Sequence, residues 1–246
     1  MLRVRLFGAF ALESDGVALP MPERGRACAL LGWLALHSGM HPRSEVAGRF
    51  WPDVLDSSAR KSLRTELVAV RHALGAAGEG VLVATRDMVG LVGDDVSVDA
   101  REFERLAGEG RLEEAVGLCD GELLPGLDAE WVYDARESHR RRLGDVLEQL
   151  AADAEAAGAL TDAVRLSRRR VALDPLHEDA HRELIRRLIA AGEIAAARVA
   201  FDDLARRLRV ALHVAPSRET RRLLEIIHAQ SDRALVNVGD AAVETE

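Results

Sequence analysis

The sequence predicts a mainly α-helical protein with a small β component. Within the first 95 residues, short β-rich runs precede three helical segments, and a run typical of a hairpin follows them. In the second half, a pattern of paired helices recurs with a period of 34 residues, as in tetratricopeptide repeats. Together these patterns predict an N-terminal winged helix-turn-helix followed by tetratricopeptide-like α-helical repeats.

The chain begins with β-rich segments. Residues 2–19 contain short apolar runs typical of strands, and Asp15-Gly16 is a strong signal for a hairpin turn. An apolar helix is expected over residues 24–38, ending near Gly39. Pro42-Arg43-Ser44 is then expected to cap a short helix over residues 45–50.

The next helix, which Gly75 is expected to end, has one apolar face and one basic face. The apolar side chains recur at helical spacing at Ala59, Leu63, Leu67, Val70 and Leu74. The side chains turned away from them are Lys61, Arg64, Thr65, Val68, Arg71 and His72. Asp56, Ser57 and Ser58 are expected to cap the start of the helix. Such a helix, preceded by a short one, fits the DNA major groove; a solvated surface helix is the alternative.

Two short β-rich runs around Arg86-Asp87 then predict a closing hairpin. The order of strands, three helices and a terminal hairpin describes a winged helix-turn-helix. The hairpin is the expected wing, with Arg86 at or near its tip.

The second half contains the repeats. Similar helical segments begin at Gly110, Gly158 and Gly192, and the last two glycines are 34 residues apart. The wider spacing after the first copy indicates an insertion over residues 121–130. A final helix over residues 218–230, capped by Ser217, is expected to close the stack.

The charge balance limits how this chain could bind nucleic acid. Its net charge is -8, and residues 1–95 contain 11 basic and 11 acidic residues, whereas nucleic-acid-binding domains are often basic. DNA binding therefore requires local clustering of positive charge. Residues 57–74 show such clustering, because Arg60, Lys61, Arg64 and Arg71 accompany the single acid Glu66. Lys61 is also the one lysine in the sequence.

Composition also indicates the compartment. Cys28 and Cys119 are the two cysteines, which form neither a disulfide framework nor a metal site. No apolar run approaches the roughly 18–20 residues that span a membrane, and residues 1–12 lack the pattern of a signal peptide. We expect a cytoplasmic protein that does not associate with membranes.

One motif is associated with catalysis. Residues 177–181 match the H-E-x-x-H pattern, in which two histidines bind zinc and the glutamate acts as a base. The motif begins a helix inside a repeat, and its histidines fall one period after Leu143 and Leu147, which favours packing positions. No phosphate-binding glycine loop or nucleophile elbow is present. We expect no enzymatic activity, no cofactor and no bound metal.

Five segments carry a resemblance to a known family: residues 4–8, 59–75, 99–106, 168–175 and 214–217. In their order and spacing they resemble the Streptomyces antibiotic regulatory protein family, and the second half resembles that family's bacterial transcriptional activator domain. The resemblance covers residue 2 to about residue 230. Members of the family are DNA-binding transcription factors that contact tandem promoter repeats and help to recruit RNA polymerase.

The resemblance implies roles for individual residues. Lys61, Arg64, Thr65 and Arg71 are implied to face the major groove or its flanking phosphates, and Arg86 to be the wing residue. Arg64 is the expected base reader, because arginine can pair bidentately with guanine. Lys61 and Arg71 are expected at phosphates, which position the helix without specifying sequence.

Two further observations complete the expected interface. Arg60 belongs to the same basic cluster as Lys61 and Arg64, and completes the set of expected DNA-binding residues. In the wing, Asp87-Met88-Val89-Gly90-Leu91 departs from the family pattern and puts an acid beside Arg86.

We therefore expect three segments. Residues 1–95 are the winged helix-turn-helix DNA-binding domain, residues 96–230 the tetratricopeptide-like bacterial transcriptional activator domain, and residues 231–246 a flexible tail. The expected function is transcription regulation, by an activator that binds double-stranded promoter DNA. RNA polymerase is an expected partner, with the loop 52–57 as its surface by resemblance only. A homodimer is a further expected assembly.

One alternative belongs to another functional class. The chain could be a helical-repeat scaffold for protein interaction or ligand sensing, whose winged helix no longer binds DNA. The neutral balance of residues 1–95 and the acid Asp87 favour this alternative. A steep fall of DNA affinity with salt would argue against it, because phosphate contacts release counterions.

Overall fold

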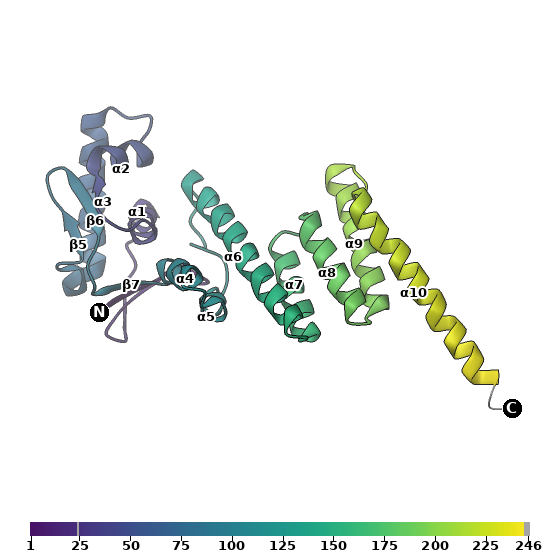
Figure 1. Cartoon of the computed structure of the whole chain (residues 1–246). Helices are drawn as coiled ribbons and strands as arrows, with labels where there is room; N and C mark the ends of the chain where they lie inside the picture. The colour runs from purple at the N-terminus through teal and green to yellow at the C-terminus, as the bar shows by residue number, and fades with distance from the viewer. Residues whose placement is uncertain (24, 244–246) are drawn as a thin grey trace. The chain divides into compact units, whose positions relative to one another are not determined.

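The computed structural model describes the backbone of residues 1–23 and 25–243, and the side chains of residues 1–23 and 25–230. The described chain forms two compact units, Met1–His139 and Arg140–Glu246. Figure 1 shows both units, coloured from purple at the N-terminus to yellow at the C-terminus.

The first unit opens with a four-stranded sheet in the order β3-β2-β1-β7. Its strands are β1 (Leu2–Arg5), β2 (Ala11–Ser14), β3 (Val17–Leu19) and β7 (Val96–Val98). Strand β1 is antiparallel to β2 and parallel to β7. The predicted hairpin turn is confirmed, because Asp15 and Gly16 have φ angles of 49° and 85° between β2 and β3. Strand β7 was not predicted.

Three helices and a second sheet complete the winged helix-turn-helix, which confirms the predicted fold. The helices are α1 (Gly25–Leu36), α2 (Arg43–Phe50) and α3 (Asp56–Leu74), and a 3-10 turn, η1 (Gly75–Gly78), follows α3. The second sheet has the order β4-β6-β5 and consists of β4 (His41–Pro42), β5 (Leu82–Ala84) and β6 (Met88–Leu91). Leu30 and Leu34 of α1 and Leu63 of α3 are fully buried in the core of this domain.

The first unit continues beyond the winged helix through α4 (Asp99–Gly108) and α5 (Leu112–Leu118). The Asp99 carboxylate accepts hydrogen bonds from the backbone N–H groups of Leu6 and Phe7, at 2.9 and 3.0 Å. In the segment expected as an insertion, the Leu124 N–H donates to the Leu6 carbonyl at 2.6 Å. Residues after position 95 therefore pack on the first sheet, and the predicted boundary there stays a prediction.

The second unit consists of paired helices and begins at Arg140, inside α6. The helices are α6 (Glu130–Ala156), α7 (Leu160–Leu173), α8 (Glu178–Ala190), α9 (Ile194–Leu212) and α10 (Arg218–Val243). In Figure 1 they follow one another in alternating directions from teal to yellow. Gly158 and Gly192 both have φ 76° at the turn inside a helix pair, as the 34-residue period predicted. Ile185, Leu188 and Phe201 contribute to the core between α8 and α9.

Two predicted caps have different outcomes. Ser217 caps α10 as expected, because its hydroxyl oxygen accepts from the Thr220 N–H at 3.3 Å. The predicted caps of α3 are wrong, because Leu55 occupies the cap position and no side-chain cap bond forms. Asp56 instead begins the helix, where its carboxylate complements the positive end of the helix dipole.

Two segments of the second unit also differ from the expectation. Helix α10 continues past residue 230 to Val243, whereas the sequence predicted its end at 230. The side chains from residue 231 onward, and residues 244–246 entirely, lie outside the described residues, so the flexible tail stays a prediction. A run of arginines such as residues 168–170 is typical of a solvated helix face, but the Arg170 side chain is only 12% exposed and pairs with Glu148 at 2.8 Å.

Candidate nucleic-acid interface

Helix α3 presents the two faces that its sequence predicted. Ala59, Leu63, Leu67, Val70 and Leu74 are all buried, which holds the helix against the core of the domain. Helix α2 packs against α3, and α1 lies beneath it. The opposite face of α3 is therefore held outward by a packed scaffold.

All five expected DNA-binding residues of α3 are exposed: Arg60, Lys61, Arg64, Thr65 and Arg71. The Thr65 hydroxyl donates to the Lys61 carbonyl at 3.3 Å, which leaves its oxygen free to accept from a ligand. Glu66, the single acid among residues 57–74, is turned inward with 9% of its surface exposed. The outward face of α3 is thus more basic than the composition of the domain indicates.

The wing is the hairpin of β5 and β6. Its turn is closed by the Thr85 N–H, which donates to the Met88 carbonyl at 2.9 Å. Arg86 and Asp87 are both exposed in this turn, so Arg86 lies at the tip as expected. The structure keeps the acid beside Arg86, where it reduces the local positive potential.

Arg43 belongs to this surface, although we expected it only in the cap of a short helix. That cap is wrong, because α2 begins at Arg43 and no side-chain cap bond forms. Its guanidinium donates to the Thr85 carbonyl at 3.0 Å, and its backbone N–H donates to the Asp87 carbonyl at 2.8 Å. Partial burial, with the positive charges of Arg64 and Arg71, lowers the pKa of Arg43 from its ordinary value. The structure therefore brings Arg43, Arg64 and Arg71 together between α3 and the wing.

This arginine cluster (Arg43, Arg64 and Arg71) is suited to an anionic ligand. Within the described residues, no carboxylate forms an ion pair with any of its three members. Three neighbouring guanidinium groups repel one another, and phosphate oxygens would relieve that repulsion. No feature of the local sequence predicts that Arg43 belongs to this cluster, because its position depends on the pairing of His41 with Val89 between β4 and β6.

A groove of about 610 Å³ lies along the C-terminal half of α3. Arg64, Val68 and His72 line it from the helix, and the segment 20–23 lines it from the other side. Glu23 is exposed in that segment and adds an acid at the edge of the basic face. The basic face of α3 therefore ends at Glu23, on the side of the segment 20–23.

The loop between α2 and α3 has a different character. Trp51 is buried and anchors it, whereas Leu55 is 81% exposed and Val54 is also exposed. Large apolar side chains at the surface are candidates for contact with a protein partner.

Both histidines of the H-E-x-x-H motif have structural roles. His177 is exposed and caps α8, because its Nδ1 accepts from the Ala180 N–H at 3.2 Å. It is therefore not the packing residue that we expected. His181 is buried as predicted, and its Nε2 donates to the Pro175 carbonyl at 3.2 Å. Across the described residues, no three potential metal ligands form a group that could hold an ion.

Comparisons with known proteins agree with this architecture. Residues 97–228 match the family described as the bacterial transcriptional activator domain. The chain also resembles the solved structure of Mycobacterium tuberculosis EmbR in complex with a low-affinity phosphopeptide, with a TM-score of 0.69 and 21% identity. That alignment covers 98% of this chain and 70% of EmbR. No curated protein matches the sequence.

The matched family is one of transcription regulators. The chain belongs to the bacterial transcriptional activator domain family, and it is a transcriptional activator of the Streptomyces antibiotic regulatory protein type. The resemblance inferred from the sequence is thereby confirmed. In the described part of the chain, the helices are too short or too polar to cross a lipid bilayer.

Proposed function

We propose that this activator binds double-stranded promoter DNA with α3 in the major groove and the β5–β6 wing against the neighbouring backbone. The observation that carries the proposal is the arginine cluster, whose members come from α2 and α3 and in which Arg43 is hydrogen-bonded to the wing turn. Arg60, Lys61 and Thr65 extend the same exposed surface along α3. A helix and a wing that share one basic surface can contact groove and phosphates together.

Each residue has a proposed part in this contact. Arg64 reads a base, because its guanidinium fork matches guanine O6 and N7. Arg43, Lys61 and Arg71 bind phosphates, and Arg86 contacts the backbone from the wing tip. The neutral composition of residues 1–95 does not oppose this assignment, since Glu66 is turned into the domain.

Further parts of the proposal concern partners. Residues 1–95 act as the DNA-binding segment and residues 96–230 as the activator segment; the family match over 97–228 supports this division. The exposed Val54 and Leu55 in the α2–α3 loop contact RNA polymerase. Two copies side by side on tandem promoter repeats, as a homodimer, complete the proposed assembly, which acts in the bacterial cytoplasm.

The experiment is retention of fragmented genomic DNA from the source organism by the purified full chain at two salt concentrations, followed by sequencing. We expect a few promoters with tandem repeats to be enriched, and affinity to fall steeply with salt because phosphate contacts release counterions. Arg64→Ala is expected to reduce discrimination at one base pair by about 1–3 kcal/mol.

Arg105→Ala is the matched control, because Arg105 is an exposed arginine of α4 that pairs with Glu102 and Glu109. It removes the same charge from a surface outside α3, α2 and the wing. Absence of retention at low salt would contradict DNA binding and favour the scaffold alternative. Equal sequence preference in Arg64→Ala and Arg105→Ala would contradict the role of Arg64 alone.

A further inference from the structure

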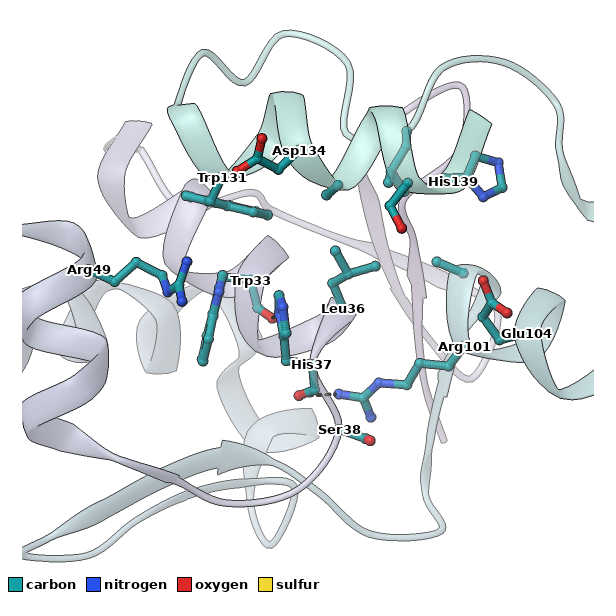
Figure 2. A pocket seen from close by; sticks show the side chains of 14 residues that line it. Trp33, Leu36, His37, Ser38, Arg49, Arg101, Glu104, Trp131, Asp134 and His139 are labelled. Carbon is teal, nitrogen blue, oxygen red and sulfur yellow. Dashed lines mark hydrogen bonds between the residues drawn. The ribbon is translucent and has the colours of Figure 1, made fainter. Parts of the chain in front are cut away.

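The first unit contains a hollow whose lining is rich in aromatic side chains. It has a volume of about 630 Å³, within the range of small-molecule sites. Trp33 and Leu36 of α1, Arg49 of α2, Arg101 of α4 and Trp131 of α6 contribute to its wall. All of its lining residues lie within Met1–His139. Figure 2 shows these side chains around one space, which we call the aromatic hollow.

Four buried side-chain nitrogens of the lining have no hydrogen-bond partner among the described residues. They are Trp33 Nε1, Arg101 Nε, Trp131 Nε1 and His139 Nε2. Buried polar groups in folded proteins are almost always paired, with protein atoms or with ordered water. Four such atoms in the lining of one hollow therefore need partners that the described residues do not supply.

The chemistry of these atoms restricts the occupant. The two indole nitrogens and Arg101 Nε are donors and cannot accept, so the occupant must supply acceptor oxygens. Arg101 is held in place because its terminal nitrogen donates to the Leu34 carbonyl at 2.7 Å and the His37 carbonyl at 3.1 Å. The latter bond is drawn in Figure 2. Its Nε is thus a fixed donor.

Charge and shape add two further restrictions. The Arg49 guanidinium lies 5.8 Å from the centre of the Trp33 ring and forms no ion pair within the described residues. The lining acids Asp134 and Glu104 balance the charges of Arg49 and Arg101. The buried indole and guanidinium nitrogens that lack a partner are nevertheless all hydrogen-bond donors. Trp131, Leu36 and Leu123 provide apolar surface suited to a flat ring.

We propose that the aromatic hollow binds a small planar aromatic carboxylate. The ring packs against Trp131, Leu36 and Leu123, and the carboxylate accepts from Arg49 and from the unpaired indole N–H groups. This site is separate from the DNA-binding face of α3, because none of the arginine cluster lines it. Its occupation would join α1, α2, α4 and the first turns of α6 through a single ligand.

The test is binding of 2-naphthoate, benzoate and indole-3-acetate to the full chain, followed by tryptophan fluorescence and calorimetry. Two of the three tryptophans line the hollow, and Trp51→Phe removes the third as background. We expect saturable binding of at least one of these carboxylates, and about tenfold weaker binding of its neutral amide. Arg49→Ala and Trp131→Phe are expected to weaken binding by about tenfold each.

Arg26→Ala is the matched control, because Arg26 also lies 5.8 Å from a tryptophan ring, that of Trp51, but does not line the hollow. It is expected to bind as the wild type does. Circular dichroism checks that each variant is folded, and Trp131→Phe keeps an aromatic side chain while removing the indole N–H together with the pyrrole ring. No saturable binding of any probe would overturn the proposal, as would equal binding of carboxylate and amide or unchanged binding in both hollow variants. In those cases water fills the hollow.

Discussion

The guanidinium of Arg43 donates a hydrogen bond of 3.0 Å to the carbonyl oxygen of Thr85, which joins the first residue of α2 to the turn of the wing. The two residues are 42 positions apart in sequence. The bond places a positive charge between the wing and the two arginines of α3. Arg43 therefore has two roles, since it positions the wing and adds to the charge that faces DNA.

We predict that Arg43→Ala lowers DNA affinity and reduces the slope of log affinity against log salt by about 1, because one phosphate contact is lost. Fluorescence anisotropy of labelled promoter DNA over a salt series measures both quantities. Arg43→Lys is the control, because it keeps the charge and therefore the slope. A slope that is the same in Arg43→Ala as in the wild type would refute the phosphate contact.

Gly90 in β6 should not tolerate a side chain. A Cβ atom there would lie 2.2 Å from the Gly39 carbonyl oxygen, so either backbone must shift. We expect Gly90→Ala to destabilise the protein by about 1–3 kcal/mol in urea unfolding, and to weaken DNA binding by displacing the wing. Gly117→Ala in α5 meets open space and is expected to be neutral or stabilising. Equal stability of the two variants would show that β6 and Gly39 can separate freely.

His139 makes stability depend on pH. Burial lowers the pKa of this imidazole from 6.5 to about 4. The centre of its ring lies 4.6 Å from that of Phe7 and 4.9 Å from that of Phe103. In the unfolded chain it takes up a proton below its ordinary pKa, whereas in the fold it stays neutral down to about 4. Its contribution to stability is therefore complete above 6.5 and is lost as the pH falls from 6.5 through 4.

The corresponding variant is His139→Leu. We expect it to reduce the loss of unfolding free energy between about pH 7.5 and about pH 4.5 by about 2 kcal/mol. Thermal unfolding at both pH values measures the difference, and His72→Leu, at an exposed position of α3, serves as the control. Identical pH profiles for wild type and His139→Leu would mean that another group causes the loss of unfolding free energy at low pH.

Arg187 forms a buried network of ion pairs and hydrogen bonds inside the repeat unit. It is 1% exposed and donates to Ser167 Oγ at 2.8 Å and to Glu155 at 3.1 Å, and it also pairs with Glu148. Removing one partner of a buried charged network leaves the others unpaired, so we expect Arg187→Met to cost about 3–5 kcal/mol.

Urea unfolding followed by circular dichroism measures this loss. Arg165→Ala breaks an exposed pair with Asp162 and should cost about 0–1 kcal/mol. A similar cost for the two variants would show that the Arg187 network contributes no more than a surface ion pair.

The periodic features of this chain could be predicted from sequence. The spacing of Leu63, Leu67 and Val70 predicted the buried face of α3, and Gly158 and Gly192 predicted the turns of the repeat. These features depend on contacts within one helix or between neighbouring helices. The caps of α3 were missed because Asp56 can either precede a helix or begin one.

The features that depend on distant residues could not be predicted. Arg43 reaches the wing only through the two-residue strand β4, which is too short to give a sequence pattern. Arg187 stands in a pair of arginines typical of a surface, and only the acids of α6 make its burial possible. Trp33, Arg101 and Trp131 come from three separate helices, so the aromatic hollow has no signature in the sequence.

Lys61 is exposed on the basic face of α3 and supplies the sequence with its one side-chain amine. Reagents that acylate amines will therefore modify this helix at a single side chain, in the unmutated protein. A photo-crosslinker attached there would identify whatever approaches α3, whether a nucleic acid or a protein. Acetylation of the same amine would remove one positive charge from that face and leave its arginines unchanged.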